Sequence, residues 1–297
     1  MPLQYSVLAL PALSRQSTAE LILFATTFIW SSTFIVLKWG LEELSPLLFL
    51  ALRFTLAAAL FALLFPASVR GLTAAALRHG ALLALLFTLG FMLQTVGLQY
   101  TTASKSAFIT GLMVVFTPLV QYLWERKPPT RANLAGIAIV TIGLWLLTDP
   151  AAKGGLNVGD LLTFLCAIAF GGYIVYLDLA SRPHEPLALT FAQIAPTALY
   201  CWLGVALLET PRFEPTWVGV GSVVYLAVAA TIVTGYVMTR YQKETTPTRA
   251  VVIYTIEPVW TALMAAALLA ERLTPMGLVG GGLILAGVLV SELVDRR

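Results

Sequence analysis

The chain contains few charged residues, and this shortage excludes most soluble folds. Asp, Glu, Lys and Arg make up 11% of its 297 residues, whereas hydrophobic residues make up 59% and the mean hydropathy is +0.86. A typical soluble domain carries about 25% charged residues. A soluble protein of this size would have to expose much of its apolar surface to water, so the composition predicts an integral membrane protein.

Cysteine and histidine are also scarce, which excludes several kinds of site. Cys166 and Cys201 each lie within an apolar run, so there is neither a disulfide framework nor a Cys-x-x-Cys metal pair. His79 and His184 fall at predicted ends of spans, where a solvated role is favoured over metal binding. No phosphate-loop or HExxH motif occurs, and the cations are scattered rather than gathered in a patch. We therefore expect no metal, no cofactor and no nucleic-acid partner.

Long apolar runs alternate with short polar breaks and predict membrane-spanning helices. Each run is close to the ~20 apolar residues that cross a bilayer core of about 30 Å. The breaks contain turn-forming and charged residues, as in EELSP, ERKPPTR and SRPHEP. The predicted fold class is an all-α integral membrane protein with ten transmembrane helices. The predicted spans are 20–40, 45–65, 77–99, 103–124, 131–149, 158–178, 186–209, 216–240, 248–270 and 274–293.

The distribution of lysine and arginine predicts which side of the membrane each loop faces. If the N-terminus is cytoplasmic, the cytoplasmic segments hold twelve of the 18 cations and the opposite side holds five, with Arg53 set aside inside the second span. Cytoplasmic loops of membrane proteins carry an excess of these residues. We therefore expect a multi-pass protein of a bacterial inner (plasma) membrane with both termini in the cytoplasm.

The two halves of the sequence resemble one another. The segment TTASKSA, residues 101–107, recurs as TTPTRAV, residues 245–251. Chance similarity between Leu- and Ala-rich helices is the alternative, but glycine, threonine and charged positions match in one register, which favours a repeat. The aligned pairs are Thr101 with Thr245, Lys105 with Arg249, Gly136 with Gly280 and Gly143 with Gly287 at an offset of 144, and Glu20 with Asp160 at an offset of 140.

The predicted repeat determines the topology. Each unit has an odd number of spans, five, so the second must enter the membrane from the opposite side to the first. We therefore expect two inverted five-helix repeats, residues 20–150 and 151–297, after a cytoplasmic segment 1–19. Lys105 and Arg249 then end hairpins on opposite faces, where each can extend to its own interface and the neighbouring threonines can cap the following helices.

Several motifs carry a resemblance to a known family. They are TTASKSAFITGL and FTPLV in the first half, and TTPTRAVVIYTIEPVW followed by ERLTP in the second. Over nearly the whole chain, the sequence resembles the ten-span EamA-type branch of the drug/metabolite transporter superfamily, and within it the YddG-type exporters of aromatic amino acids. The first half departs from the pattern, since Pro118 has no preceding glutamate and ERKPP replaces a turn like ERLTP. The resemblance implies a transporter, not an enzyme, with amino acids as substrates.

Two ionisable residues lie well within the predicted spans, where charge is costly and therefore a functional candidate. Arg53 is about 10 Å from the outer interface, and its alternatives are snorkelling, pairing with Glu42 or Glu43, or a role in the transport path. Glu257 precedes Pro258, which kinks the helix, so Glu257 either supports the fold and gating or contacts substrate or a proton. The predicted gating or structural polar residues are Arg53, Lys105, Arg249, Glu257 and Pro258.

Aromatic and polar side chains share helix faces and predict a substrate cavity between the halves. In the first span, Trp30, Ser31 and Phe34 share one face at helical spacing. A single ring is most simply lipid-facing or core packing, but rings, hydroxyls and an amide on one face cost less facing a cavity than facing lipid. The predicted substrate-binding residues are Trp30, Ser31, Phe34, Phe91, Gln94, Phe170, Tyr173, Tyr236 and Tyr254.

Together these patterns predict a secondary transporter that exports small organic metabolites, amino acids or flat cationic drugs among them, by alternating access. The expected partners are a small-molecule substrate and the lipid bilayer; the sequence leaves the oligomeric state open. An intramembrane enzyme would need a nucleophile–base pair or metal ligands within the spans, and a channel or lipid scramblase is a further alternative. A nucleotide-sugar or phosphate-ester exchanger would need several interior cations, whereas Arg53 is the single candidate.

Overall fold

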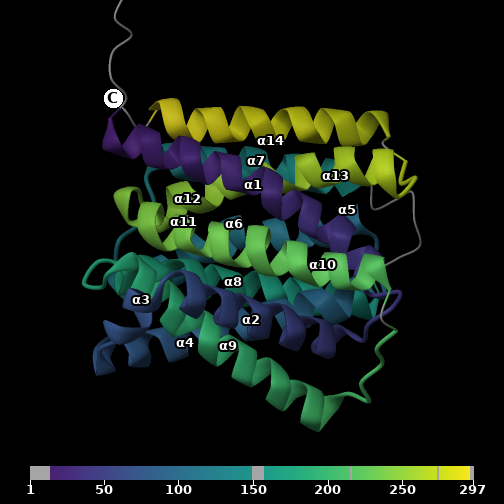
Figure 1. Cartoon of the computed structure of the whole chain (residues 1–297). Coiled ribbons are helices and arrows are strands. Elements are labelled where there is room, and N and C mark those ends of the chain that lie inside the picture. Colours follow the sequence, from purple (N-terminus) through teal and green to yellow (C-terminus); the bar gives the residue numbers. More distant parts are fainter. Residues whose placement is uncertain (1–13, 149–156, 215, 273, 295–297) are drawn as a thin grey trace, which may run out of the picture.

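The computed structural model describes residues 14–148, 157–214, 216–272 and 274–294, and these form a helical bundle (Figure 1). Within these ranges the one β-type pairing is an isolated bridge between Leu44 and Phe213. The helices are α1 (Arg15–Gly40), α2 (Pro46–Leu64), α3 (Pro66–Arg70), α4 (Ala74–Leu98), α5 (Ala103–Gly111), α6 (Met113–Glu125), α7 (Arg131–Thr148), α8 (Val158–Ser181), α9 (Pro186–Leu208), α10 (Trp217–Ala227), the π-helical η1 (Val228–Val233), α11 (Thr234–Tyr241), the 3₁₀ turn η2 (Gln242–Glu244), α12 (Pro247–Tyr254), α13 (Glu257–Leu268) and α14 (Pro275–Val294).

The described part of the chain contains eight helical segments that are long and apolar enough to cross a membrane. Three of these segments each consist of shorter helices joined end to end. They are α5 with α6, α10 with η1, α11 and η2, and α12 with α13. Shorter apolar stretches, Arg131–Leu147 and Pro275–Ser291, occupy α7 and α14. The predicted all-α membrane class is confirmed, and each predicted span coincides with a helical segment. The predicted cytoplasmic segment 1–19 falls mostly outside the described residues.

The repeated threonine motifs start helices as the sequence predicts. The Thr102 hydroxyl accepts a hydrogen bond from the backbone N–H of Lys105 at 3.2 Å, and the Thr246 hydroxyl accepts one from Arg249 at the same distance. Each threonine therefore satisfies a backbone donor that would otherwise lack a partner in the first helical turn.

Two spans are broken near their middle at equivalent positions. α5 ends at Gly111 before α6 begins at Met113, and α12 ends at Tyr254 before α13 begins at Glu257. Pro258 accounts for the second break because it lacks a backbone donor and its ring clashes with the preceding turn. The breaks face one another, since a Cβ added to Gly111 would lie 3.2 Å from Pro258 Cγ. The sequence predicted distortion at Pro258 but not the break after Gly111.

α7 and α14 pack against each other through glycine along one side of the bundle (Figure 1). A Cβ added to Gly280 would lie 2.5 Å from the Gly143 carbonyl oxygen, and one added to Gly287 would lie 2.9 Å from that of Gly136. The numbering of the pairs runs in opposite directions, so the helices are antiparallel. Small residues let membrane helices approach until their backbones touch.

The start of α1 and the end of α14 lie at the same end of the bundle (Figure 1). The predicted burial of both cysteines is confirmed, because Cys166 and Cys201 are buried and free.

Candidate functional site

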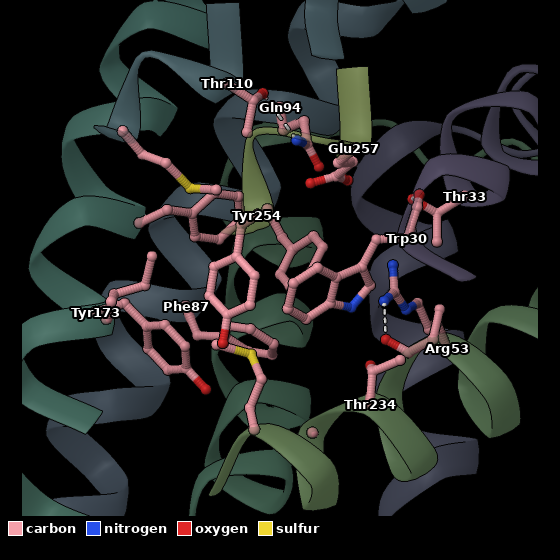
Figure 2. Close-up of a pocket in the computed structure, with 17 residues that line it drawn as sticks. Trp30, Thr33, Arg53, Phe87, Gln94, Thr110, Tyr173, Thr234, Tyr254 and Glu257 are labelled. Carbon is pink, nitrogen blue, oxygen red and sulfur yellow. Dashed lines mark hydrogen bonds between the residues drawn. The ribbon is translucent and has the colours of Figure 1, made fainter. Parts of the chain in front are cut away.

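A cavity lies between the helices near the middle of the spans (Figure 2). It encloses about 640 Å³ of non-atom space, part of which is open to solvent. Helices from both halves of the chain form its wall, whereas α7 and α14 contribute none of the described lining residues. The lining residues are Trp30, Thr33, Arg53, Phe87, Phe91, Gln94, Thr110, Met113, Phe170, Tyr173, Ile174, Ala230, Thr234, Gly235, Met238, Tyr254 and Glu257.

Most of the predicted substrate-binding residues come together at this cavity. They are Trp30, Phe91, Gln94, Phe170, Tyr173 and Tyr254, and two of the predicted gating or structural residues, Arg53 and Glu257, join them.

Three of the predicted substrate-binding residues are not in the cavity wall. Ser31 is buried and donates to the backbone carbonyl of Glu257 at 2.9 Å, so it joins α1 to α13. Phe34 is 2% exposed and belongs to a separate apolar cluster around Phe49. Tyr236 is half-buried beside the lining residue Gly235. Helical spacing identifies a face about as wide as several side chains, but packing decides which of them meets the cavity.

Aromatic rings form one continuous wall of the cavity. Phe87 stacks on Tyr173 with 4.8 Å between ring centroids, and Phe91 meets Phe170 edge to face at 5.2 Å. Gly90 makes this arrangement possible, because a Cβ there would lie 2.4 Å from the Phe170 ring. The wall is therefore apolar and polarizable, which suits an apolar or aromatic group of a ligand.

Arg53 reaches the cavity from α2 and is 1% exposed. Its Nε donates to the Thr231 hydroxyl at 2.8 Å, and one terminal nitrogen donates to the Ala230 carbonyl at 3.1 Å. Both acceptors lie in η1, where π-helical backbone often marks a functional position. The guanidinium also lies 4.7 Å from the centroid of the Phe91 ring. The alternative that Arg53 pairs with Glu42 or Glu43 is wrong, because the ion pairs of the described residues do not include Arg53.

Glu257 reaches the cavity from the first turn of α13 and is 8% exposed. Its backbone carbonyl accepts hydrogen bonds from Ser31 and Thr261, which fixes the broken helix in place. Trp30 lies beside it and meets the Tyr254 ring edge to face at 5.1 Å (Figure 2). Pro258 lies at the helix break rather than in the cavity wall, which agrees with a structural role.

A layer of hydrogen bonds holds the polar wall residues. The Gln94 amide donates to the Thr110 hydroxyl at 3.0 Å. The Tyr173 hydroxyl donates to the side-chain amide oxygen of Gln193 at 2.8 Å, and the Gln193 amide nitrogen donates to the Thr239 hydroxyl at 3.0 Å. Helical spacing did not identify Thr33, Thr110 and Thr234 as lining residues. Thr110 comes just before the break after Gly111, Thr234 directly follows η1, and Thr33 lies in the unbroken α1. Periodicity along an ideal helix does not predict which of these residues meets the cavity.

The predicted snorkelling of Lys105 is wrong, because its side chain forms an inter-half ion pair. Lys105 Nζ lies 2.6 Å from the Asp160 carboxylate, whose other oxygen accepts from the Thr101 hydroxyl at 2.9 Å. Asp160 also accepts from the backbone of Asn157 at the start of α8. Pairing is favoured over snorkelling because the Asp160 side chain is only 2% exposed and lies within reach.

Arg249 forms the counterpart at the opposite end of α1. Its guanidinium lies 3.1 Å from the Glu20 carboxylate, which also accepts from Thr245 at 3.2 Å. Both side chains are 7% exposed, so snorkelling is again the wrong description. Lys38, 18 residues beyond Glu20 on α1, donates to the Thr101 carbonyl. At about 1.5 Å per residue, roughly 27 Å of helix therefore separates the two ion-pair clusters.

The two histidines lie together where α8 ends and α9 begins. His79 Nδ1 is 2.8 Å from the Tyr176 hydroxyl, and the His79 and His184 rings are 5.2 Å apart. Burial lowers the pKa of His184, and the neighbouring His79 lowers it further. The expected solvated role is thus only partly correct, since His184 is half-buried. Within the described residues, no group of three potential metal ligands occurs.

The fold is a helical bundle with a central cavity, and sequence comparison gives its family. The sequence model of the EamA-like transporter family matches residues 17–149 and again residues 157–293. The chain therefore belongs to the EamA-like transporter family of the drug/metabolite transporter superfamily, and it is not an enzyme.

Named relatives agree with this membership. A transporter of Archaeoglobus fulgidus is 32% identical over 275 residues, which cover 93% of this chain and 86% of the relative. A probable amino-acid metabolite efflux pump of Salmonella typhimurium is 27% identical over 283 residues, which cover 89% of this chain and 91% of the relative. A protein of Escherichia coli with the same name gives the same values. A protein of known crystal structure with 21% identity has the same fold, with a TM-score of 0.77 over 95% of this chain and 99% of its own.

Proposed function

We propose that this protein is a secondary transporter that exports small organic metabolites, amino acids including aromatic ones among them, by alternating access. The observation that carries the proposal is the mid-span cavity, which both halves line and at which the broken helices meet. Secondary transporters bind substrate near the bilayer midplane, between repeats and beside discontinuous helices. The efflux-pump relatives support export and amino-acid substrates.

The proposed architecture is ten transmembrane helices in two inverted repeats, residues 20–150 and 151–297, after segment 1–19. The symmetry of the contacts supports it. The contact of Gly136 with Gly287 becomes that of Gly280 with Gly143 when each residue is replaced by its repeat equivalent. The helix starts at Met113 and Glu257 are also 144 residues apart, the offset of the repeat.

The two ion-pair clusters are the proposed gates. When each residue is replaced by its repeat equivalent, the Lys105–Asp160 pair becomes the Arg249–Glu20 pair. Thr101, which donates to the acid of the first pair, becomes Thr245, which donates to the acid of the second. Each cluster joins the two halves at one end of the bundle. Opening of the cavity toward that end separates the halves there and breaks the cluster, whereas the opposite cluster stays closed. Alternating access requires such mutually exclusive openings.

The proposed substrate contacts are Trp30, Phe91, Gln94, Phe170, Tyr173 and Tyr254. Their rings, with a few hydrogen-bonding groups, have the composition of a small-molecule pocket, and they suit flat cationic drugs as well as amino acids. Among the described lining residues Arg53 is the single cation, which disfavours nucleotide-sugar and phosphate-ester substrates. The proposed location is the plasma membrane, the bacterial inner membrane, with both termini cytoplasmic.

Transport by the purified protein in proteoliposomes tests this function. Labelled phenylalanine, leucine, glutamate, glucose 6-phosphate and an aromatic cation would be tested for counterflow, with and without a pH gradient. We expect saturable counterflow of phenylalanine. Counterflow, unlike channel flux, requires a site that is exposed alternately on the two sides, so downhill flux without counterflow would favour a channel. Movement of fluorescent lipid between leaflets would favour a scramblase.

A further inference from the structure

The cavity wall contains one cationic and one anionic residue, and they do not pair with each other. Arg53 enters from α2 and Glu257 from α13, and both reach into the space around Trp30 (Figure 2). The salt bridges of the described residues include neither of them. The other described lining side chains are aromatic, aliphatic or neutral polar.

Arg53 keeps donors available for a ligand. A guanidinium has five N–H groups, and the contacts to Thr231 and Ala230 use one on Nε and one on a terminal nitrogen. These contacts, together with the Phe91 ring below the guanidinium, fix its direction. A cation that is 1% exposed without a carboxylate partner is costly. A planar carboxylate is the ligand group that best matches its fork of donors.

Glu257 supplies the opposite charge at a separate part of the wall. The described hydrogen bonds to this residue use its backbone carbonyl, not its carboxylate. Glu257 is 8% exposed, and its side chain lies near Trp30 and Tyr254 in the cavity wall (Figure 2). A carboxylate beside aromatic rings is the chemistry that binds an ammonium group, through an ion pair and cation–π attraction.

We propose that the cavity recognises a zwitterion, an α-amino acid whose carboxylate binds Arg53 and whose ammonium binds Glu257. The wall of Phe87, Phe91, Phe170 and Tyr173 then receives an apolar or aromatic side chain. This inference rests on the proposed transport function and specifies its substrate class. Such a substrate neutralises both buried charges at once, whereas an amine alone or a carboxylic acid alone leaves one uncompensated. A charged side chain finds no partner on the aromatic wall.

Substrate analogues test the proposal on the wild-type protein without any substitution. Counterflow of labelled L-phenylalanine in proteoliposomes would be competed with L-phenylalanine, L-phenylalaninamide, which lacks the carboxylate, and N-acetyl-L-phenylalanine, which lacks the ammonium. We expect each analogue to compete at least about tenfold more weakly than phenylalanine, because each leaves one buried charge unpaired. Equal competition by all three compounds overturns the proposal.

Two variants assign the charges. Glu257→Gln should weaken competition by phenylalanine by at least about tenfold while leaving competition by N-acetyl-phenylalanine unchanged, because that analogue has no ammonium to lose. Arg53→Gln should weaken competition by phenylalanine by at least about tenfold while leaving competition by phenylalaninamide unchanged, because that analogue has no carboxylate to lose. Arg53→Lys should recover part of the loss for phenylalanine. Lys127→Gln and Glu214→Gln are charge-matched controls, because those side chains are 73% and 66% exposed. Uniform weakening of all three compounds in either variant contradicts the assigned contact.

The outcomes separate this inference from the proposed function. If an aromatic cation undergoes counterflow but no amino acid does, the protein is a transporter and the zwitterion proposal is wrong. If phenylalanine is transported but discrimination among the analogues is absent, the same conclusion holds. If no solute of the panel is transported by a protein that elutes as a single folded species, both the function and the inference are overturned.

Discussion

Lys105 of the first half lies 2.6 Å from Asp160 of the second, and this ion pair has a counterpart in which the roles of the halves are exchanged. The counterpart joins Arg249 to Glu20 at the other end of α1. In each pair, one half of the chain supplies the cation and the other half supplies the acid. Each pair can therefore form only when the halves approach each other at that end of the bundle.

Neutralising one cluster should bias the transporter toward opening at that end. Lys105→Gln should speed labelling of a cavity cysteine, Thr33→Cys, by an impermeant thiol reagent added outside, and Arg249→Gln should speed labelling from the inside in inverted vesicles. Loss of the pair of Lys105, whose side chain is 20% exposed, is worth about 1 kcal/mol, or a roughly fivefold change in population, and loss of the buried Arg249 pair should have a larger effect. The background lacks Cys166 and Cys201. Acceleration from the same side in both variants would contradict the gate assignment.

The proposed inverted repeat predicts that equivalent turns face opposite sides of the membrane. Gln99 and Lys243 are 144 residues apart, just before the Lys105 and Arg249 motifs; Gln99 is exposed and Lys243 is half-buried. In a cysteine-free background, Gln99→Cys should react with an impermeant reagent outside the cell, whereas Lys243→Cys should react only after permeabilisation. Reaction of both from one side would rule out the inverted repeat.

Glycine in α14 should be essential where it touches α7 and dispensable elsewhere. A Cβ at Gly280 would lie 2.4 Å from the Leu147 backbone nitrogen, whereas none of the described atoms lies within 4 Å of one at Gly282. Gly280→Ala should therefore lower the stability by about 1–3 kcal/mol, as overpacking does. Gly282→Ala should be neutral or slightly stabilising. Thermal unfolding in detergent, followed by size-exclusion recovery, gives the comparison; equal midpoints in the two variants would refute the close contact.

His184 should make stability fall under mildly acidic conditions. Its folded pKa is lowered from the usual value of 6.5 by burial and by His79. Above the unfolded pKa neither state binds the proton, so the residue contributes no pH dependence there. As pH falls from about 6.5 through the lowered folded pKa, the unfolded chain gains a proton that the folded protein resists, and stability is lost. His184→Gln should therefore narrow the difference between melting temperatures measured at about pH 7.5 and about pH 5.5. An unchanged difference would remove His184 from the explanation.

Removal of a cavity ring should weaken a substrate that stacks on it. Trp30→Ala and Tyr173→Ala should each raise the half-saturating concentration of phenylalanine by roughly fivefold, which corresponds to about 1 kcal/mol of ring contact and burial. Tyr173→Phe keeps the ring and loses only the hydrogen bond to Gln193, so its effect should be smaller. Trp217→Ala, on a ring that is 92% exposed, is the control. Wild-type kinetics in both alanine variants would show that these rings only pack the bundle.

Several features of this protein follow from the sequence alone. Helices that cross a membrane must satisfy their backbone hydrogen bonds internally and present apolar side chains to lipid, so the apolar runs predict the spans directly. The threonine caps are equally local, because Thr102 and Thr246 bind backbone groups three residues away. The similarity between residues 101–107 and 245–251 could be read as well, since it is a property of the residues themselves.

Which side chains meet in space was decided only by the tertiary structure. Lys105 and Asp160 are 55 residues apart, and Glu20 and Arg249 are still further apart, so no local pattern could distinguish an ion pair from snorkelling. The same holds for the cavity wall, where Trp30 enters and Phe34, one turn along the same stripe, packs into the core. Periodicity defines a face of an ideal helix, whereas the breaks at Gly111 and Glu257 rotate the segments that follow them. The sequence by itself determined the helical segments and their caps, because these depend on neighbours in the chain and on the solvent. The fold decided the site, because the site depends on how helices that are distant in the sequence pack together.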